Sequence, residues 1–370
     1  MLDLFSAELL TVTLLSRSAI DPSMVSVACD LCYLPLLITN REDVIAGLGW
    51  QLTSRGDALD ACPPCQELRS HLPRRAQCDD PLPADGGRLP DLCVIGAAKS
   101  GTTSLHTYLN QHPEIGMAPL KELRFFADPD HAGWENRYRG LFPSGKRLVG
   151  ESSTMYTRAP ALPGVAARMR AMVPDVRLIY LVRDPAERAL ASYVEERYHG
   201  LEPRTAQEAF ADLEDPYNPY VSASRYAEQL ADFLDHFPAE QILVLPLEDL
   251  DHHPEQTMRR VFTFLGVDPA APVDVSERFN ARAEKRELVG AADSMRRSLL
   301  GRVYRRIPYE RRRRFSAAVR RVITRRIEQP ELTEAQMERL RDVLAPDARR
   351  FQQMTGLTPE WMERYAAALR

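Results

Sequence analysis

The sequence lacks any long apolar segment. No run of about 18 apolar residues occurs along its 370 residues, so we expect no membrane-spanning helix. The first residues carry Asp3 and Glu8 where a secretory signal needs positive charge. Six cysteines are too few for a disulfide scaffold in a chain of this length. We therefore expect a cytoplasmic globular protein, which agrees with 44% hydrophobic and 27% charged residues.

A strong overall charge is also missing. The net charge of -4 gives no global attraction to nucleic acid or membranes, and we expect no nucleic-acid partner. The average hides a local bias, because thirteen arginines and one acid, Glu310, lie between Arg296 and Arg326. We expect residues 291–370 to form a basic helical extension that packs on the core, with a capping box at Thr333 and Gln336. The arginine run (296–326) has two interpretations: a solvated helix face, or a platform for a membrane surface or another polyanion.

Residues 1–88 show no sustained hydrophobic periodicity. They end in a stretch rich in proline, glycine and charge, "RRAQCDDPLPADGGRLP", which is typical of a linker. We predict a leader of unknown role in which nothing is catalytic. Two cysteine pairs in it have the spacing of metal ligands, Cys29 with Cys32 and Cys62 with Cys65. A zinc knuckle and a chance spacing are both open at this point.

From residue 89 to residue 290, short apolar runs alternate with helical patterns. The runs typical of buried parallel strands are 92–97, 146–152, 176–183 and 241–250. The helical patterns are 102–111, 161–172, 185–199, 223–236 and 254–265. This alternation predicts an α/β core, a P-loop-like parallel sheet flanked by helices on both faces. Ligands of such folds bind at the carboxyl ends of the strands, which are followed here by residues 96–103, 121–124, 151–153 and 183–185.

The loop after the first of these strands, in "VIGAAKSGTTSLHTYL", has the character of a phosphate site. Gly96 and Gly101 have the spacing of a Walker A loop, but Thr102 follows the second glycine where a lysine belongs, and the only lysine is Lys99. The backbone N–H groups of Gly101, Thr102 and Thr103 would face an anion at the start of the following helix. The side chains of Thr102, Thr103 and Ser104 add hydroxyl donors. No apolar strand ends in an obvious Mg²⁺-binding aspartate, so an ordinary NTPase is disfavoured. A lysine placed earlier on the loop can instead lie beside the bridging oxygen of a leaving group.

These residues resemble a known family. The loop 94–109 is similar to the 5′-phosphosulfate loop of sulfotransferases that use 3′-phosphoadenosine 5′-phosphosulfate (PAPS), and "LIYLVRDPAERALASY" (178–193) resembles their 3′-phosphate element. Two further segments resemble the heparan sulfate branch, namely "KELRFF" (121–126) and "LVGESSTMY" (148–156), and "LAPDARRFQQMTGLTPEW" (344–361) resembles the C-terminal helix of the family. The resemblance covers residues 90 to 365 approximately and does not include the leader.

The resemblance implies roles for individual residues. Lys99 would contact the bridging oxygen between the 5′-phosphate and the sulfate, where a fixed cation stabilises the charge that develops as the bond breaks. The 5′-phosphate would be held by residues of the same loop, Ser100, Gly101, Thr102 and Thr103. Arg183 would bind the 3′-phosphate through its planar fork. Asp184 and Pro185 read independently as the N-cap and first residue of the next helix.

The resemblance also names a catalytic base, Glu122, which would remove a proton from the attacking acceptor. Each role has a plainer alternative. Glu122 would pair with Lys121 or Arg124 as a solvated residue, and Arg183 would form a surface ion pair with Glu187 or Asp184. His106 and His112 read as packing or surface residues, and the basic loop 279–287 offers low-specificity candidates for the 3′-phosphate.

Three positions depart from the family pattern. Two residues after Glu122, where the heparan branch often has a histidine, this chain has Arg124, which leaves the acceptor side open. The serine expected eight residues after Arg183 is replaced by Ala191, and Ser192 follows it about 100° further around the helix. Where the heparan branch often has a lysine after Glu151, this chain has Ser152, so a cation near the sulfate or an acidic sugar is missing there. The acceptor is therefore open.

The resulting hypothesis is a PAPS-dependent sulfotransferase. It would move a sulfuryl group to a hydroxyl or amine, on a carbohydrate acceptor by preference and otherwise on a small molecule, and the motif requires no metal. A P-loop kinase or NTPase is one alternative. A degenerate, non-catalytic nucleotide-binding module is another, and Ala191 and Ser152 are its best support.

Overall fold

The computed structural model describes residues 86–199, 202, 204–276 and 332–366, together with five short strands outside these ranges. Its centre is a sheet of five parallel strands in the order β5-β6-β4-β7-β8. The strands are β4 (Leu92–Gly96), β5 (Ile115–Met117), β6 (Leu148–Ser152), β7 (Arg177–Val182) and β8 (Ile242–Pro246). The predicted parallel α/β architecture is confirmed.

The strand order places a ligand site. After β4 the chain builds β5 and β6 on one side, and it then returns to build β7 and β8 on the other. This change of direction is a topological switch point, and ligands of open parallel sheets bind outside the carboxyl ends of the strands there. The segments that follow β4, β6 and β7 therefore surround the expected crevice.

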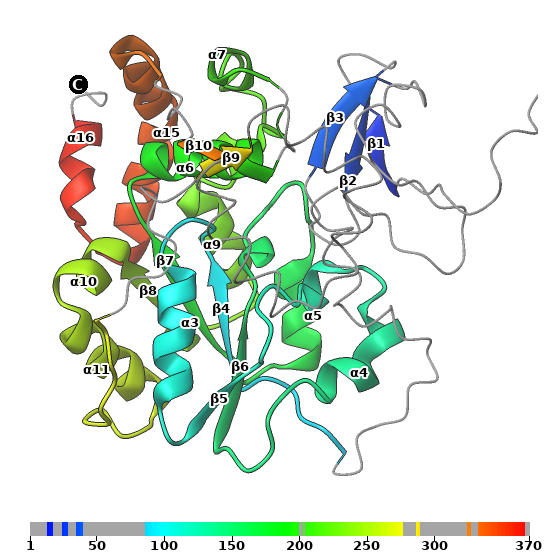
Figure 1. Ribbon diagram of the computed structural model, residues 1–370, viewed down its shortest axis with the longest axis vertical. Coiled ribbons are helices and arrows are strands. Elements are labelled where there is room, and N and C mark those ends of the chain that lie inside the picture. The colour runs from blue at the N-terminus through cyan, green and yellow to red at the C-terminus, as the bar shows by residue number, and fades with distance from the viewer. Residues whose placement is uncertain are drawn as a thin grey trace, which may run out of the picture.

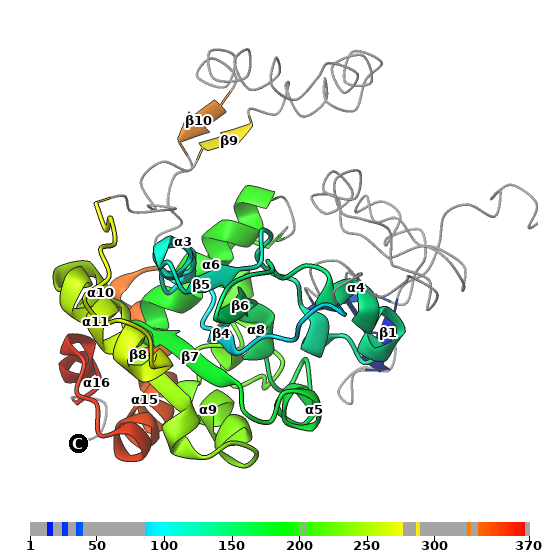
Figure 2. The ribbon, with the colours of Figure 1, turned by 90° about the horizontal axis from the view of Figure 1, so that it is seen from below.

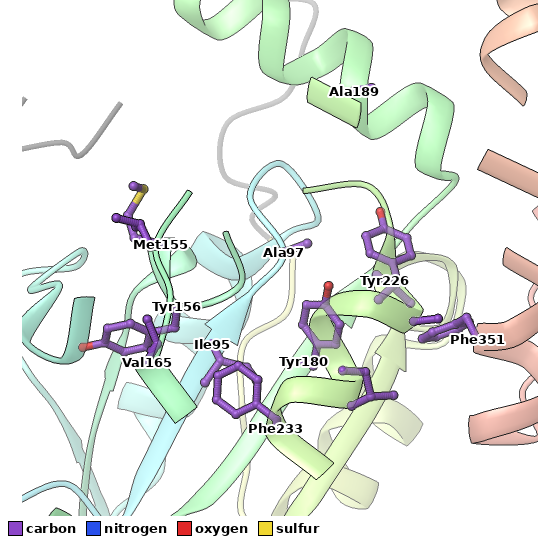
Figure 3. Close-up of a cluster of buried hydrophobic side chains, with 14 of the residues drawn as sticks. Ile95, Ala97, Met155, Tyr156, Val165, Tyr180, Ala189, Tyr226, Phe233 and Phe351 are labelled. Atoms are coloured by element: carbon purple, nitrogen blue, oxygen red, sulfur yellow. The ribbon is translucent and has the colours of Figure 1, made fainter. Parts of the chain in front are cut away.

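Alternation along the central strands builds a core on each face of the sheet. Leu92 and Val94 of β4 pack with the helices α3 (Thr102–Gln111), α10 (Leu247–His252) and α11 (Pro254–Leu265). Cys93 and Ile95 face a second cluster with α5 (Val165–Met172), α6 (Pro185–His199), α9 (Tyr226–Leu234) and α15 (Glu334–Thr355). Successive side chains of a strand point to opposite faces, so an all-apolar run fits a sheet covered on both sides. Figures 1 and 2 show the two helical layers, and Figure 3 shows part of the second cluster, with Ile95 beside side chains from several elements.

The helices largely match their expected ranges. Those that cover the sheet are α3 (Thr102–Gln111), α5 (Val165–Met172), α6 (Pro185–His199), α9 (Tyr226–Leu234), α10 (Leu247–His252), α11 (Pro254–Leu265) and α15 (Glu334–Thr355). Shorter helices are α4 (Glu135–Arg139), α7 (Ala206–Ala209), α8 (Pro219–Ser222) and α16 (Glu363–Ala366). The helix expected from residue 161 begins only at Val165, because Gly164 precedes it with a left-handed φ of 73°.

The C-terminal part is partly as expected. The capping box of Thr333 and Gln336 opens α15, which packs against α6 and α9. A helix was expected through the whole arginine run, and this is wrong at its end, where β10 (Thr324–Arg326) pairs antiparallel with β9 (Arg286–Leu288). The rest of the run lies outside the described residues.

The leader contains three strands that the sequence did not predict. They are β1 (Thr13–Arg17), β2 (Met24–Ala28) and β3 (Pro35–Thr39), which form an antiparallel sheet. The cysteine pairs Cys29/Cys32 and Cys62/Cys65 lie outside the described residues, so the zinc knuckle stays a prediction. Within the described residues, no helix is both long and apolar enough to cross a membrane.

Candidate active site

The loop between β4 and α3 has the geometry of an anion site. Gly101 precedes α3 in a left-handed conformation with φ 85°, and a Cβ there would lie 2.6 Å from Leu247 Cδ1. The first turn of α3 has no side-chain cap and no acidic residue. The first N–H groups of a helix have no partner within the helix, and the helix dipole favours negative charge at that end. Ser100 is buried, while Thr103 is half-buried at the helix start.

Lys99 is held in this loop by a contact that the sequence did not suggest. Its Nζ lies 3.1 Å from Glu195 Oε2, an ion pair with side chains about a quarter exposed, at 22% and 28%. Glu195 belongs to α6, so the helix behind the crevice supplies a carboxylate to the loop. Lysine and carboxylate lie 96 positions apart in sequence, which explains why no local pattern pointed to the pair.

Arg183 follows β7 and connects the two predicted phosphate-binding segments. Its Nη1 donates to the backbone oxygen of Lys99 at 3.3 Å. The plainer alternative is present as well, because its Nη2 lies 3.8 Å from Glu187 Oε2. The predicted helix start is confirmed, since Asp184 Oδ1 accepts from the N–H groups of Ala186 and Glu187 at 2.9 and 3.1 Å.

Asp184 also ties this helix start to the C-terminus. Tyr365 Oη and Arg364 Nη1 donate to its two carboxylate oxygens, each at 2.9 Å. The C-terminal segment therefore supports the position of Arg183 from behind, through its chain neighbour.

Glu122 is fixed by the end of β6. Its N–H donates to the backbone oxygen of Ser152 at 2.8 Å, and its Oε2 accepts from the N–H of Thr154 at 2.9 Å. The hydroxyl of Thr154 lies 3.2 Å from both carboxylate oxygens. Among the described residues no ion pair joins Glu122 to Lys121 or Arg124, so the solvated-pair alternative does not describe its contacts.

Glu151 plays a structural part beneath Glu122. It is fully buried and accepts hydrogen bonds from three hydroxyls, those of Tyr138, Tyr156 and Ser153. Burial raises the pKa of its carboxyl above the ordinary value, while these hydrogen bonds act in the opposite direction. Ser153 Oγ in turn accepts from the N–H of Arg124 at 3.0 Å, so Glu151 anchors the segment that carries Glu122.

Lys121 belongs to one of the segments predicted to surround a ligand, but sequence reasoning gave its side chain no role in the site. Its Nζ donates to Thr103 Oγ1 at 2.9 Å and to Thr102 Oγ1 at 3.2 Å, at the start of α3. Burial lowers the pKa of the Lys121 ammonium; Glu122 acts to raise this pKa and Lys99 to lower it. The available signal was a lysine next to the predicted base, but the preceding strand β5 has only three residues and was not recognised.

The two histidines differ in their surroundings. His112 is a packing residue as expected: it is buried, and its ring lies 4.5 Å from that of Phe262. His106, in contrast, lies at the site, with Nδ1 2.9 Å from Ser152 Oγ. Burial, followed by the nearby charge of Lys121, lowers the pKa of His106 to about 4. We therefore take His106 to be neutral near pH 7, beside the strand end that was expected to lack a cation.

Backbone strain is concentrated at the same place. In the described part of the chain, three residues other than glycine have positive φ: Lys99 at 69°, Glu122 at 60° and Arg124 at 60°. Such conformations cost about 1 to 3 kcal/mol each and persist where the surroundings enforce them, often at functional sites. Two of the three are the residues that were predicted from the sequence as catalytic.

Other predicted features lie beyond what the structure describes. The 3′-phosphate candidates of the basic loop fall among undescribed residues, except that β9 includes the backbone of Arg286. Within the described ranges, no group of three or more His, Cys, Asp or Glu side chains could hold a metal ion. Ser192 is buried on α6, one residue beyond the position of the expected serine.

Comparison with known proteins agrees with this arrangement. The sequence profile described as "Sulfotransferase domain" matches residues 89–358. The chain belongs to the sulfotransferase family. Membership confirms the resemblance seen in the sequence and the parallel α/β fold, and it agrees with a PAPS-dependent sulfotransferase as the expected class of enzyme.

Individual relatives cover different shares of the chain. Heparan sulfate glucosamine 3-O-sulfotransferase 6 from Mus musculus is 30% identical over 312 residues, which are 81% of this chain and 80% of that protein. Bifunctional heparan sulfate N-deacetylase/N-sulfotransferase 2 from Bos taurus is 27% identical over 201 residues, 49% of this chain, and the match spans only 22% of that longer protein. The crystal structure of a sulfotransferase from Alicyclobacillus acidocaldarius has a TM-score of 0.54 and 25% identity, and covers 76% of this chain and all of the other.

Proposed function

We propose that this sulfotransferase moves a sulfuryl group from PAPS to a hydroxyl or amine of a carbohydrate. The observation that carries the proposal is the convergence of three strand ends. Lys99 follows β4, Arg183 follows β7 and reaches the backbone of Lys99 at 3.3 Å, and Glu122 is held by the end of β6. The heparan sulfate enzymes among its relatives support a carbohydrate as the acceptor class.

The residues present fit a donor with a phosphosulfate at one end and a phosphate at the other. The start of α3 offers N–H groups without a side-chain cap, and Lys99 adds a cation beside them. Thr102 and Thr103 add hydroxyl groups at the same helix start. Arg183 supplies a planar guanidinium at the next strand end, which suits a phosphate dianion.

The chemistry follows from these positions. When bound, PAPS supplies an activated sulfuryl group. Lys99 would stabilise negative charge on the oxygen that leaves with the 5′-phosphate. Glu122 would accept the proton that the acceptor hydroxyl or amine loses as its bond to sulfur forms. Arg183 would hold the 3′-phosphate and so orient the donor, and no step calls for a metal.

Binding and transfer test the proposal together. We expect calorimetric titration with adenosine 3′,5′-bisphosphate to show tight binding that weakens at least tenfold in Arg183→Ala, because a charge-assisted bidentate contact is lost. ATP with Mg²⁺, run in parallel, should bind poorly. Transfer from ³⁵S-labelled PAPS to heparosan, de-N-sulfated heparan sulfate and a simple phenol should favour a glycan, and Lys99→Ala should abolish it.

Each alternative has its own outcome in these assays. Binding of ATP with Mg²⁺ alone would indicate a kinase or NTPase. Bisphosphate binding without transfer to any acceptor would indicate a degenerate module, and unchanged turnover by Lys99→Ala would refute the assigned roles. The cytoplasmic location and the polyanion platform of residues 296–326 stay predictions.

A further inference from the structure

Lys121 reaches from one strand end to the phosphate loop of another. The segment that carries it leaves β5, and β6 lies between β5 and β4 in the sheet. Backbone bonds on both sides keep the segment along β6, from Ala118 N–H to Gly150 at 2.7 Å and from Glu122 N–H to Ser152 at 2.8 Å. Its ammonium therefore arrives at the start of α3 from the side on which Glu122 lies.

The surroundings of this ammonium are unusual for a half-buried lysine. Among the described residues its two hydrogen-bond partners are neutral hydroxyls, Thr102 Oγ1 and Thr103 Oγ1, at 3.2 and 2.9 Å. Among the described residues no carboxylate oxygen lies within 4.0 Å of its Nζ, although Glu122 is its chain neighbour. A half-buried cation whose hydrogen-bond partners are neutral hydroxyls is costly, and an anion at the helix start would offset that cost.

The positions of the few lysines in the sequence also favour an anion site at this loop. Of 48 lysines and arginines, only four are lysine, at positions 99, 121, 146 and 285. In a chain that uses arginine almost everywhere, two of the four lysines meet at one loop. A compact ammonium can donate to the two adjacent threonine hydroxyls in a small space, whereas a broad guanidinium would need more room.

We propose that Lys121 is a second donor-binding cation, which contacts the phosphosulfate from the acceptor side while Lys99 contacts its bridging oxygen. This inference rests on the proposed function. In the reaction the acceptor oxygen or nitrogen forms a bond to sulfur, the bond from sulfur to the bridging oxygen breaks, and the electron pair stays on the 5′-phosphate. The proton goes to Glu122. Lys121 keeps its proton throughout and stabilises negative charge on the non-bridging oxygens of the 5′-phosphate, next to Thr102 and Thr103, and on those of the sulfuryl group in transfer.

The proposal also accounts for Ser152, which stands where the heparan branch often has a lysine. The Ser152 hydroxyl is engaged by His106, and the same strand end aligns Glu122, the neighbour of Lys121. The positive charge would thus be supplied by the segment that follows β5 and not by β6.

A pair of ligands separates donor binding from a structural role. Adenosine 3′,5′-bisphosphate carries a 5′-phosphate and adenosine 3′-monophosphate does not. We expect Lys121→Met to weaken binding of the bisphosphate about 10- to 50-fold and to leave binding of the monophosphate within twofold of wild type. Lys121→Arg should recover part of the loss. The control is Lys146→Met, which removes the same charge from a position just before β6, where Lys146 Nζ donates to the backbone oxygen of Pro113. This substitution should leave the affinity for both ligands unchanged.

Transfer kinetics and melting complete the test. Lys121→Met should lower kcat/KM for PAPS at least 100-fold with little change in the acceptor KM. Equal loss of both nucleotides together with a lower melting temperature would overturn the proposal in favour of a structural role. Unchanged bisphosphate binding would also overturn it. Absence of bisphosphate binding by the wild type would instead refute the proposed function on which it rests. If Lys121→Met does not fold, Lys121→Gln is measured in the same way.

Discussion

The ion pair between Lys99 and Glu195 makes a quantitative prediction about donor affinity. At 3.1 Å and an effective dielectric constant of about 20, two unit charges attract by roughly 5 kcal/mol before solvation costs. The side chains are about a quarter exposed, and measured pairs of this kind contribute nearer to 1 kcal/mol after desolvation and screening. When an anionic donor binds Lys99 in place of Glu195, the loss of this ion pair makes the net binding free energy less favourable by about 1 kcal/mol.

Removing the carboxylate should therefore strengthen donor binding. We expect Glu195→Gln to bind adenosine 3′,5′-bisphosphate about fivefold more tightly, which corresponds to about 1 kcal/mol. The gain should shrink as salt is raised, because screening weakens the interaction that the substitution removes. Calorimetric titration at low and at high salt measures both effects.

The control for this experiment is Glu255→Gln, which removes one negative charge from an exposed position in the first turn of α11. It should leave the affinity within the error of the measurement. Weaker binding by Glu195→Gln would refute the reasoning, because it would mean that Glu195 orients Lys99 for the donor and does not compete with it.

Three further predictions concern the same site. His106→Asn should lose less stability than wild type on acidification. The pKa of His106 in the folded state is about 4, below its ordinary value of 6.5, so the stability that neutral His106 provides above pH 6.5 is lost as the pH falls. In urea unfolding without nucleotide, the wild type should lose about 2 kcal/mol from this group at pH 5. Equal losses of stability in the wild type and in His106→Asn would contradict this. Ala191→Ser, which lies four residues from Glu187 and from Glu195 on one face of α6, should tighten bisphosphate binding three- to tenfold by calorimetry, and no change would mean that the face does not reach the 3′-phosphate. Gly101→Ala should cost about 1 to 2 kcal/mol in urea unfolding and more than Gly145→Ala, which shares a positive φ but has open space around its Cβ; equal costs would exclude a role for the Leu247 contact.

The sequence predicted the elements whose signals are local. The helices at 102–111, 185–199 and 254–265 were expected with the bounds that the structure shows. Each begins at a strong punctuation signal, a glycine before Thr102 and a proline at the first position of the other two. In contrast, β5 has three residues, too few for any hydrophobic period to be visible, and it is defined by its pairing with β6.

The site likewise contains residues that a local sequence pattern predicts and residues that depend on the three-dimensional fold. Lys99 and Arg183 were accessible because each belongs to one continuous strand-loop-helix motif. The partner of each predicted catalytic residue was not accessible, since Glu195 and Thr154 come from distant segments. Lys121 was visible as a residue, but its direction toward the start of α3 depends on how the chain leaves β5.

The way in which the two predicted catalytic residues are held suggests different behaviour on ligand binding. Glu122 is fixed by its backbone N–H and by two groups of Thr154, and Ser153 links that segment to the buried Glu151. Replacing these hydrogen bonds of Glu122 would disrupt the end of β6. The carboxylate of the predicted base is therefore already in position before an acceptor binds. Lys99, in contrast, has a strained backbone but a side chain whose described ion pair with Glu195 is partly exposed. A donor can replace that carboxylate without moving the loop, which lets the lysine change partner while the scaffold stays fixed.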